Sequence, residues 1–304
     1  MNDLLRIGTR GSPLALAQAH ETRARLMQAL QRGQDTFEII AIKTTGDMVS
    51  NRPLSEIGGK GLFTKELEEA LMEGRIDLAV HSMKDMTAHL PHDLEIGAVL
   101  PREDARDAFI SISAKSLNNL PYKARLGSSS VRRTAQALRL RPDLVVAPFR
   151  GNVETRLQKL KDGVADATFL AAAGLRRLGL QQHITSLIST DDMLPAVAQG
   201  AIAIQVKRGS GALDYVEKIN HLESNIAVTC ERAFMAALDG SCRTPIAGLA
   251  ILQNGEVVFR GEALTLDGKH VFTTRRQCAP SDAARVGRDA GEEVKARGGS
   301  LIAY

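Results

Sequence analysis

The sequence has few aromatic residues and no tryptophan. Among its 304 residues there are eight phenylalanines and three tyrosines. So few rings provide no stacking platform for the bases of a nucleic acid. The formal net charge is only +4, so an overwhelming basic field is also absent. We therefore expect no nucleic-acid partner.

Long apolar runs are also lacking. No stretch approaches the roughly 20 apolar residues that a membrane-spanning helix needs. Residues 1–6 begin a strand pattern and do not contain the apolar segment of a signal peptide. We therefore expect a cytoplasmic protein without a membrane partner.

Cysteine is scarce, and the three cysteines show neither metal-site spacing nor a disulfide framework. Cys230 falls on the apolar face of a predicted helix and is interpreted as a core residue. Cys278 has no evident partner. Cys242 lies in a loop just past a helix end, where Arg243 can favour its thiolate. From these residues alone, Cys242 is either a reactive thiol or an inert one, and no metal site is predicted.

Strand-like runs alternate with helical patterns through the first two thirds of the chain, which is typical of α/β units around a mostly parallel sheet. The predicted strands are 5–8, 37–43, 76–81, 94–100, a strand ending at 125–127, 144–149 and 167–172. The predicted helices are 12–33, 64–73, 130–140 and 152–161, and Ser12 and Asn152 are predicted to cap the first and the last of these. Residues 101–104 are predicted to link two domains, and 194–206 to form a turn and a strand that returns to the first domain.

The last third has a different pattern. A predicted helix at 224–238 is followed by three predicted strands, at 246–252, 257–266 and 270–276. Asn254-Gly255 and Asp267-Gly268 between them are strong hairpin signals. A last helix is predicted from 281 to about 297, which gives an antiparallel α+β module.

Seven arginines fall in loops after apolar runs or in the first turns of predicted helices: Arg10, Arg132, Arg133, Arg150, Arg156, Arg176 and Arg177. A helix N-terminus already carries partial positive charge, so a cation there is mildly unfavourable. Arg132 and Arg133 directly follow the capping serines of residues 128–130, which makes sense only if an anion lies beside them. Several such positions predict a cleft for a ligand with many carboxylates or phosphates.

Two further segments are candidates for a site. Residues 80–85 run off the end of a buried strand, where ligands gather in open α/β sheets. Lys84 and Asp85 there are either functional or a loop salt bridge, and His81 is interpreted as a structural hydrogen-bonding group rather than a general base. The glycine-rich segment 58–63 with Lys60 is an anion cradle, a mobile lid or a plain loop, and its spacing excludes a P-loop.

Together these segments closely resemble the porphobilinogen deaminase (hydroxymethylbilane synthase) family over nearly the whole chain. The matching motifs are Thr9-Arg10-Gly11-Ser12-Pro13-Leu14-Ala15, 58–63, 80–85, 127–133, Arg150-Gly151-Asn152-Val153, 173–180, 194–200 and Gly240-Ser241-Cys242. The resemblance implies an α/β fold of two type II periplasmic-binding-protein-like domains hinged around a cleft, plus a C-terminal α+β domain with a three-stranded antiparallel sheet. The implied domains are 1–100 plus 195–218, 101–194 and 219–304.

The same resemblance implies a transferase of tetrapyrrole (haem) biosynthesis. Members condense four porphobilinogen molecules head to tail, release ammonia at each step, and form linear hydroxymethylbilane. Their dipyrromethane cofactor is held by a thioether to a cysteine, which Cys242 matches, and Asp85 matches the catalytic aspartate. Positions that bind cofactor and substrate carboxylates, or support that site, are matched by Arg10, Ser12, Lys60, Lys84, Ser129, Arg132, Arg133, Arg150, Arg156 and Arg177. A monomer is implied, with transient hand-over of the product to uroporphyrinogen-III synthase.

This chemistry suits the residues. Every pyrrole of the growing chain carries an acetate and a propionate, and forked guanidiniums bind carboxylates well. Loss of ammonia leaves an electron-poor pyrrole, whose positive charge a fixed carboxylate such as Asp85 can stabilise.

The chain departs from the family pattern at four places. Met86-Thr87 stands where Val-Pro is frequent, Ala198 where glycine is common, Glu56 where some members have a basic residue, and Arg243 where glutamine is frequent. Two rival functions remain open. A non-enzymatic cytoplasmic anion-binding or sensing protein of the same hinged fold would need neither Asp85 nor Cys242. A cysteine hydrolase would need a base near Cys242.

Overall fold

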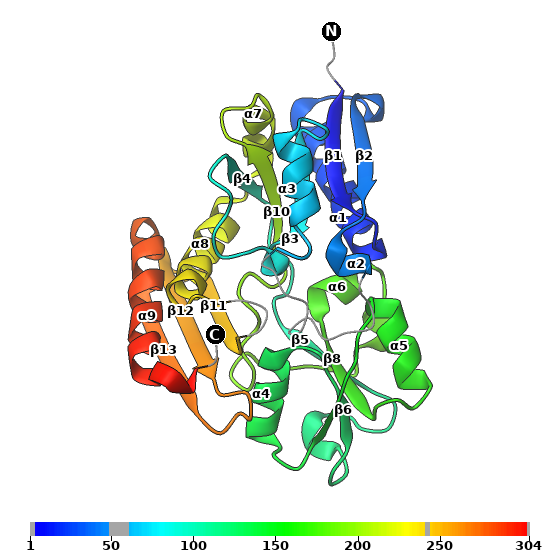
Figure 1. Cartoon of the computed structure of the whole chain (residues 1–304), viewed down its shortest axis with the longest axis vertical. Coiled ribbons are helices and arrows are strands. Elements are labelled where there is room, and N and C mark those ends of the chain that lie inside the picture. Colours follow the sequence, from blue (N-terminus) through cyan, green and yellow to red (C-terminus); the bar gives the residue numbers. More distant parts are fainter. Residues whose placement is uncertain (1–3, 49–60, 241–243, 303–304) are drawn as a thin grey trace. The chain divides into compact units, whose positions relative to one another are not determined.

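The computed structural model describes residues 4–48, 61–240 and 244–302 (Figure 1). These residues form two compact units. The first contains the described residues up to 103 together with 200–225, and the second contains 104–199 and 226–302. The second unit holds two of the three sheets. The boundary after 103 lies within the predicted linker, while the division into three domains remains a prediction.

The sheet of the first unit has five strands in the order β2-β1-β3-β10-β4. The strands are β1 (Leu5–Arg10), β2 (Phe37–Ile42), β3 (Leu78–Ser82), β4 (Leu94–Val99) and β10 (Ile202–Lys207). β1 is parallel to β2 and β3, whereas β10 is antiparallel to both β3 and β4. The segment after 194 therefore supplies a strand to the first sheet, as predicted.

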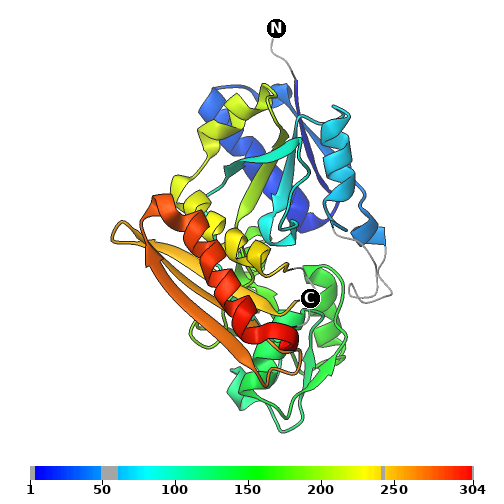
Figure 2. The ribbon, with the colours of Figure 1, turned by 60° about the vertical axis from the view of Figure 1, so that its left-hand side comes forward.

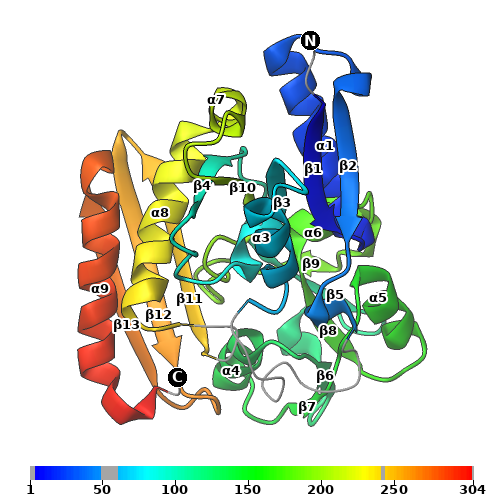
Figure 3. The same ribbon diagram turned by 45° about the horizontal axis from the view of Figure 1, so that its top comes forward.

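Helices cover both faces of this sheet. α1 (Pro13–Leu30) begins at Ser12, whose Oγ accepts the amide hydrogen of Ala15 at 3.3 Å, with proline in the first turn. α1 and α7 (Ala212–Val216) share one apolar core with the sheet. Both helices are labelled in Figure 3. α3 (Lys65–Met72) buries Leu67 and Leu71 in a separate core. A short helix, α2 (Thr45–Met48), follows β2.

The second α/β sheet repeats this arrangement. Its order is β7-β6-β8-β5-β9, and β5 is antiparallel to β8 and β9. The strands are β5 (Asp107–Ser111), β6 (Arg125–Gly127), β7 (Val145–Ala147), β8 (Ala167–Ala171) and β9 (Ser186–Leu187). β5 is the first strand after the chain leaves the first sheet, and it is antiparallel to its neighbours in the second sheet. β10 is the first strand after the chain leaves the second sheet, and it is antiparallel to its neighbours in the first sheet. This shared order confirms the type II periplasmic-binding-protein-like fold.

Helices again lie on both faces. α4 (Val131–Leu140) contributes Ala137 to one core, while α5 (Val153–Lys161) and α6 (Ala172–Arg177) contribute Leu157 and Leu175 to another. The predicted caps are confirmed, because Ser130 Oγ accepts from the Arg133 amide at 3.4 Å and Asn152 Oδ1 from the Thr155 amide at 2.8 Å.

The C-terminal module is a three-stranded antiparallel sheet with two helices, also as predicted. Its elements are α8 (Leu222–Ala237), β11 (Ile246–Gln253), β12 (Glu256–Leu264), β13 (Val271–Cys278) and α9 (Ala283–Gly298) (Figure 2). Phe234 of α8 packs edge-on against Phe259 of β12, with ring centroids 5.1 Å apart. The turn after β12 requires Gly268, because φ is +72° and a Cβ there would lie 2.2 Å from the carbonyl oxygen of Ala135 in α4.

Short 3₁₀ helices complete the described secondary structure: Gln34–Thr36, Met83–Asp85, Leu117–Asn119, Gln181–His183, Glu217–Ile219, Pro280–Asp282 and Gly299–Leu301. Among all the helices in the described ranges, none combines the length and apolar character that crossing a membrane requires.

Candidate active site

Polar side chains gather at the carboxyl ends of the parallel strands in the first sheet. Arg10 ends β1, Asp47 follows β2, and Asp85 follows β3. β2, β1 and β3 are neighbours in the sheet, so these ends meet at one edge. A cavity opens there, and Arg10, Ser12, Gln18, Phe63, His81 and Asp85 are among its lining residues.

Arg10 is the central cation of this cavity. Its guanidinium lies over the ring of Phe63, 4.2 Å from the centroid. Nε donates to Asp47 Oδ2 at 3.2 Å, and Nη2 bonds to the other oxygen of the same carboxylate. Nη1 lies 3.9 Å from Asp85 Oδ2. The side chain of Asp85 is 33% exposed, so its carboxylate remains accessible at the cavity.

His81 has the structural environment that the sequence predicted. It is buried, and its Nε2 lies 2.9 Å from Oε1 of Gln205 on β10. Burial lowers the pKa of His81 to about 4, so the imidazole is neutral at pH 7. Lys84 and Asp85 follow in the 3₁₀ turn after β3.

The second sheet places its candidate residues in the same way. β7, β6 and β8 are neighbouring parallel strands. The loops and helices after their carboxyl ends carry Ser129, Arg132, Arg133, Arg150, Arg156 and Arg177. Each α/β sheet therefore gathers its candidates at one edge.

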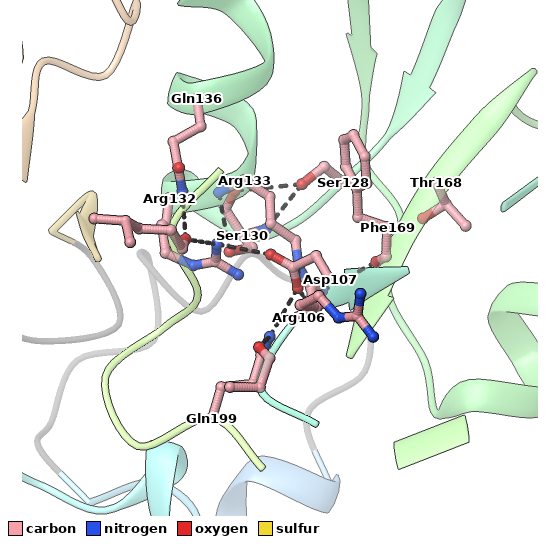
Figure 4. Close-up of polar contacts among 12 residues, drawn as sticks. Arg106, Asp107, Ser128, Ser130, Arg132, Arg133, Gln136, Thr168, Phe169 and Gln199 are labelled. Carbon is pink, nitrogen blue, oxygen red and sulfur yellow. Dashed lines mark hydrogen bonds and ion pairs between the residues drawn. The ribbon is translucent and has the colours of Figure 1, made fainter. Parts of the chain in front are cut away.

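The structure corrects the prediction that Arg132 and Arg133 need a ligand anion beside them. The anion beside them is Asp107 of β5, a residue that the sequence analysis did not single out (Figure 4). Asp107 Oδ2 lies 2.8 Å from Arg132 Nη1, and Oδ1 lies 2.7 Å from Arg133 Nη2. Exposure is 0% for the Asp107 side chain and 5% and 8% for the two arginines. These positions therefore do not require a ligand anion to be understood.

The two arginines keep the carboxyl group of Asp107 ionised. Burial alone would raise its pKa, but the two guanidiniums outweigh burial and hold the pKa well below its ordinary value. Gln199 Nε2 also donates to Oδ1, at 3.0 Å (Figure 4). Asp107 is thus an ionised carboxylate with several donors around it.

The two arginines use their donors differently. Arg133 donates to Asp107 through Nε and Nη2, and to the Phe169 carbonyl through Nη1 at 3.0 Å. Arg132 uses one nitrogen for two contacts, because its Nη1 donates to the Leu194 carbonyl at 2.7 Å and pairs with Asp107. Arg133 is therefore the more strongly tied to the protein itself.

Arg150 has a guanidinium nitrogen that is available to bind a ligand carboxylate. Its Nη1 is shielded from solvent and has no hydrogen-bond partner among the described residues. A buried cationic donor without a partner is costly, and a ligand carboxylate would satisfy it. Nearby in the chain, Ser129 Oγ accepts from the Phe149 amide at 3.1 Å, and Arg156 Nε donates to the Gly151 carbonyl at 2.9 Å.

Several predicted positions lie outside the described residues: Lys60, Cys242, Glu56 and Arg243. The other two cysteines are buried, at 0% exposure for Cys230 and 9% for Cys278. Burial raises the pKa of Cys230 to about 12, which confirms its interpretation as a core residue rather than a nucleophile.

One departure from the family pattern has a visible backbone consequence. Ala198, which stands where the family commonly has glycine, adopts φ +58°. Its amide donates to Glu231 Oε2 at 2.6 Å, and the other oxygen of Glu231 accepts from the Ala250 amide at 2.7 Å. The buried Glu231 thereby ties residue 198 to α8 and β11.

Sequence reasoning missed Asp47 and Asp107, the carboxylates that pair with the arginines. Asp107 carries one local signal, a charged residue at the start of the apolar run 108–110. Asp47 carries none, because only the fold brings it beside a residue 37 positions earlier.

Comparison with known proteins identifies the family. The family model described as "Porphobilinogen deaminase, dipyromethane cofactor binding domain" matches residues 5–214, and "Porphobilinogen deaminase, C-terminal domain" matches residues 225–296. The porphobilinogen deaminase of Paracoccus denitrificans is 54% identical, with 96% of this chain and 94% of that protein covered. The chloroplastic porphobilinogen deaminase of Pisum sativum is 52% identical, with 97% and 82% covered.

Solved structures with a similar fold are more distant. Lactococcus lactis GlnP substrate binding domain 2 has a TM-score of 0.42 at 12% identity, covering 78% of this chain and 90% of that one. A TRAP periplasmic solute binding protein from Desulfovibrio salexigens has a TM-score of 0.43 at 10% identity, covering 74% and 73%. By its family models and by relatives more than half identical over nearly its full length, this chain belongs to the porphobilinogen deaminase family.

Proposed function

We propose that this protein is a hydroxymethylbilane synthase, a transferase that joins four porphobilinogen molecules head to tail and releases ammonia at each step. The observation that carries this proposal is the family match over nearly the whole chain. The deaminase names of relatives at 52–54% identity favour it over a non-enzymatic anion sensor of the same fold. Linear hydroxymethylbilane for haem biosynthesis would be the product.

Asp85 is the residue we assign to catalysis. When porphobilinogen loses ammonia, positive charge spreads over its ring nitrogen, and an ionised carboxylate beside it lowers the energy of that state. Asp85 lies at the end of a buried strand, lines the cavity and remains partly exposed. Its oxygen is 3.9 Å from Arg10, so it is not closely bound by this arginine.

The arginines are assigned to the carboxylates of the pyrroles. Each ring brings an acetate and a propionate, and planar guanidiniums bind such groups with two parallel hydrogen bonds. Arg10, together with Ser12 and Lys84, would bind carboxylates in the first unit. Ser129, Arg132, Arg133, Arg150, Arg156 and Arg177 would bind carboxylates in the second unit or support the residues that do.

A dipyrromethane cofactor held by a thioether to Cys242 completes the proposal. Its support is the family model's description as a dipyromethane cofactor binding domain. The residues present suit such a group, because the unpartnered Nη1 of Arg150 can receive one of its carboxylates. When bound, the cofactor would supply a covalent anchor from which the chain of pyrroles is extended. Lys60 is assigned to the same carboxylates.

The finer expectations remain predictions. These are the three-domain division, a cytoplasmic location, a monomer, and hand-over of the product to uroporphyrinogen-III synthase. A curated relative is named chloroplastic, so location differs among related proteins.

The test is direct. Purified protein is incubated with porphobilinogen, and the loss of porphobilinogen and release of ammonia are measured together. The proposal expects one ammonia for each porphobilinogen consumed, with hydroxymethylbilane as product. Protein that binds porphobilinogen but leaves it unchanged would instead favour the anion-binding alternative.

A further inference from the structure

Arg10 is held on two sides in the described structure. Asp47 occupies one edge of its guanidinium through Nε and Nη2, and the ring of Phe63 lies against one face. The remaining end, which carries Nη1, lies near Asp85 at the cavity. Two contacts on different sides fix the plane of the guanidinium as well as its position.

Asp47 is itself well supported. Thr44, which is fully buried, donates from Oγ1 to Asp47 Oδ2 at 2.8 Å. The next residue, Thr45, donates its amide to Glu66 Oε1 of α3 at 2.8 Å. The short helix α2, which carries Asp47, is therefore joined to α3, and the carboxylate has a defined place.

Asp47 is also charged at neutral pH. Burial raises its pKa, but hydrogen bonds from Arg10 and Thr44 outweigh that effect and lower the pKa below its ordinary value. An ionised carboxylate on the Nε edge of an arginine leaves the other end of the fork available for a second carboxylate.

We infer that Asp47 is a positioning residue, which orients Arg10 so that the Nη1 end of its guanidinium receives a substrate carboxylate beside Asp85. This inference rests on the proposed function for the identity of that substrate. An arginine that must find its orientation after the substrate arrives binds less tightly than one already held in place. Asp47 therefore acts through Arg10 and does not itself contact the reacting atoms.

A different role for Asp47, competition with the substrate for Arg10, predicts the opposite change in KM. If Asp47 competed with the substrate for Arg10, its removal would free the guanidinium and lower KM. If Asp47 orients Arg10, its removal raises KM. The sign of the change therefore distinguishes the two roles.

The experiment compares Asp47→Asn with wild type and with Asp77→Asn. Asp77 is a matched control, because it pairs with Arg6 in the same two-bond geometry within the same unit. Its partner Arg6 does not line the cavity, whereas Arg10 does. We expect Asp47→Asn to raise KM for porphobilinogen about tenfold, as for loss of a hydrogen bond to a charged group, with a smaller change in kcat. Asp77→Asn should leave KM unchanged. Asp47→Glu, which keeps the carboxylate, should raise KM less than Asp47→Asn does.

A double-mutant cycle separates positioning from any independent effect. In an Arg10→Leu background, adding Asp47→Asn should change KM less than twofold, because the group that Asp47 orients is gone. Equal effects of Asp47→Asn in both backgrounds, or a lower KM in the single variant, would overturn the inference. Failure of the wild-type protein to consume porphobilinogen would instead count against the proposed function.

Discussion

The carboxylate of Asp107 and the guanidinium of Arg133 form a buried ion pair, with Nη2 2.7 Å from Oδ1. Arg132 approaches the second oxygen of the same carboxylate. Asp107 begins β5, and the two arginines, 25 and 26 residues later in the chain, lie in the first turn of α4. One acidic residue therefore supplies counter-charge at the start of this helix. The protein therefore supplies an internal anion for these two arginines.

Replacing Asp107 should be strongly destabilising. Asp107→Asn leaves two guanidiniums in a buried place without their counter-charge, and breaking a buried pair costs about 3–5 kcal/mol. The free energy of unfolding, measured in urea, should fall by this amount. Asp191→Asn is the control, because Asp191 is 82% exposed in its pair with Arg260 and should change stability by less than about 1 kcal/mol. Similar losses for the two variants would contradict the assignment.

The same pair predicts a dependence of stability on pH. The folded-state pKa of Asp107 is held well below its ordinary value of about 3.9, so the folded protein keeps this carboxylate ionised where the unfolded chain protonates it. The stabilisation is present above that ordinary pKa and is lost as pH falls further. Unfolding free energies between about pH 6 and pH 2.5 should decrease more steeply for wild type than for Asp107→Asn. Parallel curves would show that Asp107 does not carry this dependence.

Replacing Arg132 and replacing Arg133 should have different effects on stability and on cofactor assembly. Arg133→Leu removes donors to both Asp107 and the Phe169 carbonyl, so it should lower the free energy of unfolding more than Arg132→Leu does. Arg132→Leu should mainly impair cofactor assembly and chain elongation, and Arg132→Lys should rescue these only partly, because lysine lacks the fork. Urea unfolding and the amount of bound pyrrole provide the two measurements. Normal cofactor assembly in Arg132→Leu would remove this residue from carboxylate binding.

Asp85 should matter for turnover more than for folding. Asp85→Asn keeps the size of a partly exposed side chain but removes the charge that stabilises the cationic pyrrole. We expect kcat to fall roughly 10²–10³-fold, with urea unfolding near that of wild type. Near-normal turnover in a correctly folded Asp85→Asn protein would exclude Asp85 from the mechanism.

The sequence predicted those parts of the fold that depend on neighbouring residues. Ser12, Ser130 and Asn152 cap helices where expected, because a capping bond joins residues only three positions apart. β5 and β9 were not predicted. β9 has only two residues, and β5 begins with an aspartate that is acceptable inside the protein only because α4 brings two guanidiniums to it.

For the candidate site, too, the sequence predicted only the features that depend on neighbouring residues. Arg10, Ser12 and Asp85 were found from local motifs, and the parallel strands bring them to one cavity. Their partner Asp47 could not be found in this way, because its pairing with Arg10 depends on the register of β1 against β2. Local patterns indicated which residues carry charge, whereas the fold determined which carboxylate meets which guanidinium.

We propose that this chain builds its product on a dipyrrole anchored at Cys242. The thiolate is a far better nucleophile near neutral pH than a serine hydroxyl, so Cys242→Ser should lose most of the adduct and the activity. Cys230→Ser is the matched control for the anchoring site, because Cys230 is fully buried and its thiol has a raised pKa.

The most direct measurement is the intact mass of the purified, active protein, followed by peptide mapping. We expect a mass that exceeds the mass of the sequence by two pyrrole units, with the added mass on the peptide containing Cys242 and none on Cys230 or Cys278. Active protein with the mass of the sequence alone, or with the adduct on another cysteine, would contradict this proposal.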